Sequence, residues 1–308
     1  MARSELVISV PNDQLAGDLA PLPAGVEVVV WPMTDDAPRD RFDMVVGPHA
    51  NLTAALAHLD GVEVGLLQSQ SIGYEGVAEH VPAGVPFANA ATVHESSTGE
   101  LAVALAVAAQ RLIPEFVRAQ DEHEWRPRFA ESLADRRVTL LGFGGVGKAI
   151  AARLQGFEVQ LTAVATRARE EDGVTVRALA DLHDVLASTE VLIASLPGGD
   201  STRHVLDAAA LAALPDGALI VNVGRGPLID TDALVAEVRN GRLRAALDVT
   251  DPEPLPSDHP LWALPGALIV PHVGGDSSAM RSRITRLVRN QIERMLADEP
   301  PLNVVLEG

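Results

Sequence analysis

The feature that most constrains the fold is a glycine-rich turn between a predicted strand and a predicted helix. The strand covers 138–141, the turn reads GFGGVG at 142–147, and an alanine-rich helix follows. This is G-x-G-x-x-G at a strand–helix junction, where backbone N–H groups and the helix N-terminus bind the pyrophosphate of a dinucleotide. The alternative is a glycine-rich turn in some other α/β fold. The predicted cofactor-binding residues of the turn are Gly142, Gly144, Gly145, Val146 and Gly147.

Short apolar runs alternate with helical segments along both halves of the chain, which predicts parallel βαβ units. The first half has predicted strands at 6–10, 26–30, 44–46, 64–67 and 87–88, with a helix at 51–59 opened by Asn51 as a cap residue. The second half has predicted strands at 138–141, 159–163, 191–195, 219–223, 245–248 and 268–270. Helices are expected at 92–111 and from 278 to about 297, with an irregular charged segment at 114–137. A chain of 308 residues is long enough for about two domains.

Composition excludes several classes of partner. With 24 basic and 42 acidic residues, the net charge of −18 repels nucleic acid and anionic membranes. No apolar run approaches the roughly 18 residues that a membrane helix needs. The chain has no cysteine, which removes thiolate ligands and nucleophiles and fits a reducing cytoplasm. The nine histidines show no metal-ligand spacing, so we predict no metal site.

The end of the second predicted cofactor-domain strand indicates which dinucleotide binds. An NAD enzyme usually places Asp or Glu about 20 residues beyond the glycine turn, where it binds the ribose 2′-hydroxyl. Here the segment carries Thr166, Arg167 and Arg169, with no carboxylate before Glu170. Because arginine binds a 2′-phosphate bidentately, we predict that NADP(H) is favoured, while NAD(H) stays possible. The alternative is a pair of solvated surface arginines.

Three further strands end in polar residues suited to carbonyl reduction. Arg225 lies in NVGRG, Glu253 in DVTDPEP and His272 in PHVGG. In an open α/β sheet such strand ends face the ligand. A histidine can donate the proton, a carboxylate favours its charged form, and an arginine can bind a substrate carboxylate. Taken singly, each has an ordinary structural alternative: a turn residue, a solvated carboxylate and a structural histidine.

These segments resemble the D-isomer-specific 2-hydroxyacid dehydrogenase family. The resemblance is close from about 138 to 275, through GFGGVG, LPGGDSTRHVLD, LIVNVGRGPLIDTDALVAEVRNGRLRAALDVTDPEPLP and IVPHVGG. The N-terminal part is less similar, and its best segment is SIGY at 71–74. The resemblance implies two Rossmann-like or flavodoxin-like, doubly wound α/β domains with the active site in the cleft between them. Residues 1–97 plus 276–308 would form the substrate-binding domain, and 98–275 the dinucleotide-binding domain.

The resemblance also implies roles for individual residues. Arg225 would bind the substrate carboxylate and carbonyl. His272 would be the general acid or base, and Glu253 would hold His272 and raise the pKa of its imidazole. The backbone N–H groups of Ile72 and Gly73 would bind the other side of the carboxylate. Asp248 would bind the nicotinamide amide. The remaining predicted cofactor contacts are Leu196, Pro197, Thr202, Val223, Gly224, His272 and Gly274.

The resulting hypothesis is an NADPH-linked reductase of a small 2-keto acid, since Thr166-Arg167 is similar to the glyoxylate and hydroxypyruvate reductase branch. Three alternatives stay open: an NAD-dependent D-2-hydroxyacid dehydrogenase, a phosphoglycerate dehydrogenase, and a non-catalytic dinucleotide-sensing scaffold. A scaffold need not keep the arginine, glutamate and histidine together. A homodimer is expected, because the family usually pairs through the cofactor domain and twofold dimers are the commonest oligomers. The apolar helix at 101–109 is a candidate for that contact, with an internal core helix as the alternative.

Overall fold

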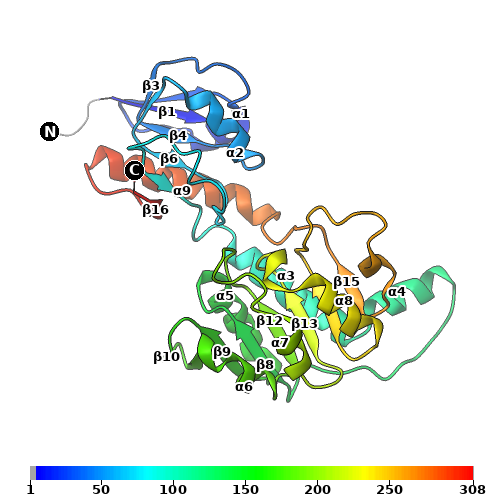
Figure 1. Cartoon of the computed structure of the whole chain (residues 1–308). Coiled ribbons are helices and arrows are strands. Elements are labelled where there is room, and N and C mark those ends of the chain that lie inside the picture. The colour runs from blue at the N-terminus through cyan, green and yellow to red at the C-terminus, as the bar shows by residue number, and fades with distance from the viewer. Residues whose placement is uncertain (1–4, 308) are drawn as a thin grey trace. The chain divides into compact units, whose positions relative to one another are not determined.

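The computed structural model describes residues 5–307 and divides the chain into two compact units. The first unit contains the chain up to His94 and from Ser278 onward, and the second is Glu95–Ser277. The sequence analysis predicted the domain boundaries at 97/98 and 275/276. Each unit is an α/β structure with its own sheet (Figure 1).

The first unit is built on a six-stranded sheet in the order β16-β7-β6-β4-β1-β2. All neighbouring pairs are parallel except β16 with β7. The strands are β1 (Leu6–Val10), β2 (Val26–Val30), β4 (Met44–Val46), β6 (Leu67–Gln68), β7 (Phe87–Ala88) and β16 (Val304–Leu306), and a separate pair joins β3 (Arg41–Phe42) to β5 (Glu63–Val64).

Side chains alternate between the two faces of this sheet, so each face buries its own apolar cluster. One cluster contains Ile8, Val46 and Ile284, and joins the sheet to α1 (Asp13–Leu19) and α9 (Ser278–Leu296). The other contains residues of α2 (Leu52–Ala55) and the 3-10 helix η1 (Leu56–Leu59). The C-terminal helix α9 therefore completes the first unit.

The second unit is built on an eight-stranded sheet in the order β10-β11-β9-β8-β12-β13-β14-β15, parallel except for β10 with β11. Its strands are β8 (Arg137–Leu141), β9 (Gln160–Ala165), β10 (Arg169–Glu171), β11 (Val174–Ala178), β12 (Val191–Ala194), β13 (Leu219–Asn222), β14 (Arg244–Leu247) and β15 (Ala267–Ile269). Its helices are α3 (Glu95–Gln110), α4 (Ile113–Asp121), α5 (Gly145–Leu154), α6 (Leu182–Leu186), α7 (Ala208–Ala213) and α8 (Thr231–Arg239), with 3-10 turns η2 (Gln155–Phe157), η3 (Leu179–Asp181), η4 (Gly226–Leu228) and η5 (Pro260–Ala263).

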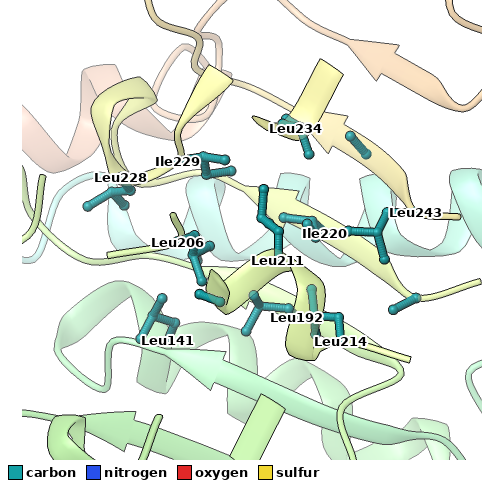
Figure 2. Packing of buried hydrophobic residues seen from close by; sticks show 14 of the residues in the cluster. Leu141, Leu192, Leu206, Leu211, Leu214, Ile220, Leu228, Ile229, Leu234 and Leu243 are labelled. Atoms are coloured by element: carbon teal, nitrogen blue, oxygen red, sulfur yellow. The ribbon is translucent and has the colours of Figure 1, made fainter. Parts of the chain in front are cut away.

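Helices cover both faces of the second sheet, as the apolar strands require. Leu140 and Ile193 face the cluster that includes α3 and α5, while Leu141 and Leu192 face the one that includes α6, α7 and α8. Figure 2 shows the second cluster, with leucine and isoleucine side chains of strands and helices pointing toward one another. This doubly wound core places the carboxyl ends of the central strands at one edge of the sheet.

The α/β prediction is confirmed, and most strands lie within two residues of their predicted bounds. The strand predicted at 64–67 is wrong: it is two short strands, because β5 pairs with β3 while β6 pairs with β4. The helix at 51–59 is a short α-helix continued as a 3-10 turn. Asn51 adopts a left-handed conformation (φ 57°) and its side chain makes no cap hydrogen bond.

The irregular segment predicted at 114–137 is also wrong in its first part, which forms α4. Pro114 does not stop a helix there but lies in the first turn of one, where its missing N–H is tolerated. The preceding Leu112 is left-handed (φ 56°), which separates α4 from α3. The hairpin of β10 and β11 and the strand β16 were not predicted at all. Among residues 5–307, no helix is long and apolar enough to span a membrane.

Candidate active site

The glycine-rich turn joins β8 to α5 and is shaped by one positive φ angle and one close backbone contact. Gly142 has φ +108°, a backbone conformation that residues other than glycine rarely adopt. A Cβ on Gly147 would lie 2.2 Å from the carbonyl oxygen of Gly142, so the helix packs directly on the turn. A Cβ on Gly144, by contrast, would meet no heavy atom within 4 Å. The turn is therefore tight on its inner side and open at the residue predicted to approach a pyrophosphate.

The N-terminus of α5 suits a phosphate. Its cap residue is Gly144, which has no side chain to accept from the first helical N–H groups. The first helical N–H groups thus need an acceptor, and the helix dipole favours an anion there. The residues present fit the pyrophosphate of a dinucleotide.

The two arginines beyond β9 lie in different surroundings. The guanidinium of Arg169 donates to a carboxylate oxygen of Glu171 at 2.6 Å, to the carbonyl of Arg167 at 3.1 Å and to the carbonyl of Phe143 in the glycine turn at 3.4 Å. Glu171 also accepts from Lys148 of α5 at 2.5 Å, and its pKa is lowered by the hydrogen bonds from Lys148 and Arg169. Arg169 therefore holds the hairpin against the turn. The exposed side chain of Arg167 makes no hydrogen bond or ion pair within residues 5–307.

The turn after β13 places Arg225 through a buried asparagine. Asn222, which is 1% exposed, donates its amide N–H to the carbonyl of Arg225 at 2.8 Å and accepts from the N–H of Gly224 at 3.0 Å. A Cβ on Gly226 would lie 1.8 Å from the carbonyl oxygen of Thr250, so only glycine fits there. Arg225 is thereby held half-buried beside the segment that follows β14.

His272 and Glu253 form a direct pair. The Nδ1 atom of His272 lies 2.5 Å from Oε1 of Glu253, and the other oxygen of Glu253 accepts from the N–H of Thr250 at 3.4 Å. The hydrogen bond with Glu253 raises the pKa of His272 above its ordinary value and lowers the pKa of Glu253. The charge of Arg225 lowers both pKa values, so all three residues lie within electrostatic reach. The trio that the sequence singled out is brought together.

Asp248 at the end of β14 anchors the histidine loop, a contact that the sequence analysis did not predict. Its buried carboxylate accepts the N–H of Val273 at 2.7 Å and that of Gly274 at 3.0 Å, and its backbone carbonyl accepts the N–H of His272 at 2.7 Å. Burial raises the pKa of Asp248. A Cβ on Gly274 would lie 2.8 Å from this carboxylate. Asp248 thus fixes the backbone on both sides of the histidine side chain.

The remaining predicted cofactor contacts lie at the same edge of the second sheet. Leu196 and Pro197 follow β12, and a Cβ on Gly224 would lie 2.6 Å from the carbonyl of Leu196. The hydroxyl of Thr202 donates to the carbonyl of Pro197 at 2.8 Å. Val223 is buried after β13. Ile72 and Gly73 belong to the first unit, in the loop after β6.

A dinucleotide turn and a histidine–carboxylate pair on one doubly wound sheet define a dinucleotide-dependent oxidoreductase. Residues 103–274 match the family model of the D-isomer specific 2-hydroxyacid dehydrogenase, NAD binding domain. The chain therefore belongs to the D-isomer specific 2-hydroxyacid dehydrogenase family, and it is an NAD(P)-dependent 2-hydroxyacid dehydrogenase. The resemblance found in the sequence is confirmed.

Similar proteins agree with this assignment. The chain is 30% identical to a glyoxylate/hydroxypyruvate reductase B of Erwinia tasmaniensis over 74% of each chain, and 27% identical to the human glyoxylate reductase/hydroxypyruvate reductase over 90% of each. Among solved structures, a D-isomer specific 2-hydroxyacid dehydrogenase of Xanthobacter autotrophicus in complex with NADPH and MES superimposes with a TM-score of 0.81. It shares 26% identity and covers 99% of both chains.

Proposed function

We propose that this enzyme reduces a short 2-keto acid, such as glyoxylate or hydroxypyruvate, to the D-2-hydroxy acid with NADPH. The observation that carries the proposal is the His272–Glu253 pair within the field of Arg225. Raising the pKa of His272 keeps a proton available near neutral pH for a keto oxygen. Reductases of these two acids among the similar proteins support the substrate class.

Each residue of the trio has one task in this mechanism. Arg225 binds the substrate carboxylate and stabilises the negative charge that develops on the keto oxygen. His272, held by Glu253 at Nδ1, directs Nε2 toward the substrate and donates the proton to that oxygen. A bound reduced nicotinamide supplies the hydride. Glu253 orients the imidazole and stabilises its charged form. Ile72 and Gly73 supply N–H groups to the carboxylate, and Asp248 keeps its proposed role toward the nicotinamide amide.

The direct test is oxidation of NADPH and of NADH with a panel of 2-keto acids. We expect the highest kcat/KM with glyoxylate or hydroxypyruvate and NADPH. Turnover confined to NADH would identify the NAD-dependent dehydrogenase instead, and oxidation of 3-phosphoglycerate alone would identify a phosphoglycerate dehydrogenase. Tight dinucleotide binding without turnover of any acid would favour the non-catalytic scaffold.

We further propose that Arg167, rather than Arg169, binds the 2′-phosphate of NADPH, with Thr166 beside it. The guanidinium of Arg169 already donates hydrogen bonds to Glu171 and to the glycine turn, whereas the side chain of Arg167, which is also exposed, makes no hydrogen bond or ion pair within residues 5–307. An NADPH complex of a similar structure supports this choice of cofactor.

Arg167→Ala is expected to raise KM for NADPH by about 10- to 100-fold while changing KM for NADH less than about threefold, because only NADPH carries the phosphate. The measurement is steady-state kinetics with both cofactors at saturating keto acid. Arg177→Ala is the matched control, since Arg177 is an exposed arginine on β11 whose partner is Asp181. Equal losses with both cofactors would contradict the assignment.

We also propose a homodimer. We place its contact on α4 and the segment that follows α4, and not on α3 as the sequence suggested. The middle of α3 packs into the core, with Ala102, Leu105 and Ala106 buried. In contrast, Trp125 is 97% exposed and Phe129 is 95% exposed, and apolar surface of that size favours a protein interface. We propose that a second copy of this chain covers these rings.

A Trp125→Ser, Phe129→Ser double variant is expected to sediment as the 32.4 kDa monomer, because it loses the two largest exposed apolar side chains of the proposed contact. The wild-type protein is expected to sediment at twice that mass. Trp262→Ser is the control, because Trp262 is a half-exposed tryptophan elsewhere in the second unit. A dimer that survives the double substitution would place the interface on another surface.

A further inference from the structure

The loop after β6 in the first unit is held by hydrogen bonds to its backbone carbonyl oxygens. Three successive carbonyl oxygens each accept a hydrogen bond. That of Gln70 accepts from Nε2 of His94 at 2.6 Å, that of Ser71 from the N–H of Ala90 at 2.9 Å, and that of Ile72 from Nδ2 of Asn89 at 2.9 Å. All three donors belong to the segment that follows β7.

These bonds also set the direction of the N–H groups. A trans peptide is planar, and its C=O and N–H point in opposite directions. The carbonyl of Ser71 shares a peptide with the N–H of Ile72, and the carbonyl of Ile72 shares one with the N–H of Gly73. Holding the two oxygens therefore directs both N–H groups away from the 89–90 segment. Within residues 5–307, neither N–H makes a hydrogen bond.

Asn89 is itself fixed on every side. It is 6% exposed; its N–H donates to the carbonyl of Asn303 at 3.0 Å, and its carbonyl accepts from the side chain of Gln68 at 3.0 Å. The side-chain oxygen accepts the N–H of Ala91 at 3.1 Å. Because that oxygen faces a donor and Nδ2 faces a carbonyl, only one orientation of the amide satisfies both groups. A buried amide with both ends bonded is a rigid support.

We propose that Asn89 is a positioning residue for substrate binding: by holding the carbonyl of Ile72, it directs the N–H of Gly73 toward the substrate carboxylate. This inference rests on the proposed function. Asn89 does not touch the substrate in this account. Its effect is to keep a backbone donor in place before the substrate arrives, which removes the conformational cost of ordering the loop on binding.

Asn89→Asp tests the proposal with a nearly isosteric change. The carboxylate still accepts from the N–H of Ala91, but it has no donor for the carbonyl of Ile72 and repels it. We expect KM for the keto acid to rise by about 10- to 100-fold, the range for a lost hydrogen bond to a charged group. The expected changes in kcat and in the dissociation constant of NADPH, measured by cofactor fluorescence, are less than about threefold.

Asn303→Asp is the matched control. Its Nδ2 donates to the carbonyl of Ala91 at 3.0 Å, so this change removes an amide donor to the same segment without touching the Ile72 peptide. We expect its KM to stay within about twofold of wild type. Asn89→Ala, which removes both side-chain bonds without adding charge, is the second variant and should raise KM in the same way.

The outcomes separate this inference from the proposed function. A wild-type enzyme that turns over no 2-keto acid overturns the proposed function, and the inference with it. An active wild type with unchanged KM in folded Asn89→Asp and Asn89→Ala overturns the inference alone. Thermal unfolding is followed for every variant. Failure of both Asn89 variants to fold would also contradict the inference, since Asn89 would then serve stability and not the direction of one N–H.

Discussion

Arg225→Ala is expected to lower kcat/KM for the 2-keto acid by about 10³-fold or more. The substrate carboxylate loses a bidentate, charge-assisted partner, and the oxygen that becomes negative loses a nearby cation. The dissociation constant of NADPH, measured separately by fluorescence, should change little, because the proposed pyrophosphate site lies at the other end of the cofactor contacts. Steady-state kinetics at saturating NADPH is the measurement.

A second readout comes from pH. The charge of Arg225 lowers the pKa of His272, so its removal should move the alkaline limb of the kcat/KM profile to higher pH. Arg203→Ala is the control, because Arg203 is an exposed arginine 3.8 Å from Asp251 and outside the trio. Arg225→Lys should recover only part of the activity, since an ammonium cannot bind a carboxylate as a planar fork. Full activity of Arg225→Ala would overturn the mechanism.

The α/β architecture could be predicted because most of the strands are apolar runs, and central strands such as β4, β12 and β13 bury their side chains on both faces. The sequence analysis predicted the first and last residues of β1, β2, β4 and β7 correctly. The errors arose where local pattern and tertiary pairing disagree. Pro114 indicates a helix end by itself, yet the left-handed Leu112 before it lets a new helix begin there. The β10 strand has the sequence Arg-Glu-Glu, which carries no apolar signal.

The sequence predicted the residues proposed to act on the substrate more completely than the residues that hold them in place. Arg225, Glu253 and His272 follow strands in a doubly wound sheet, so their convergence follows from topology. Asp248 bonds to the N–H of Val273, which lies 25 residues further along the chain, so no local pattern reveals that contact. The bonds of Asn222 to Arg225 and of Arg169 to Glu171 join residues three and two positions apart, but they depend on the shapes of the turn after β13 and of the β10–β11 hairpin. Only Asn222 had a local signal, as an asparagine directly before a glycine-rich turn. The different roles proposed for Arg167 and Arg169 could not be predicted, because they depend on the β10–β11 hairpin, which the sequence analysis missed.

The second large effect is expected at the acid–base pair. His272→Asn should lower kcat by about 10²- to 10⁴-fold, the usual contribution of a positioned general acid. Glu253→Gln is the more informative change, because glutamine keeps an oxygen for the Nδ1–H of His272 and removes only the charge. The expected result is a shift of the pH profile of reduction, with a smaller loss of kcat at acidic pH.

The direction of that shift follows from the pKa changes. Reduction needs protonated His272, so activity is present below its pKa and falls as pH rises through it. Glu253 raises this pKa above the ordinary value of about 6.5, which extends the active range to higher pH. Glu253→Gln should therefore move the alkaline limb to lower pH. The measurement is kcat/KM for the keto acid from pH 5 to 9, and an unmoved limb would contradict the role of Glu253.

The same pair contributes to stability only in a bounded pH range. The contribution of His272, whose pKa is raised, is complete below its unfolded pKa and is lost as pH rises through the folded value. The contribution of Glu253, whose pKa is lowered, is present above its unfolded pKa and is lost as pH falls through the folded value. With 47% and 41% of the two side chains exposed, solvent screening keeps this contribution small. Glu253→Gln should therefore change the pH profile of catalysis far more than the melting temperature, and a large fall in that temperature with an unchanged profile would make the pair a structural one.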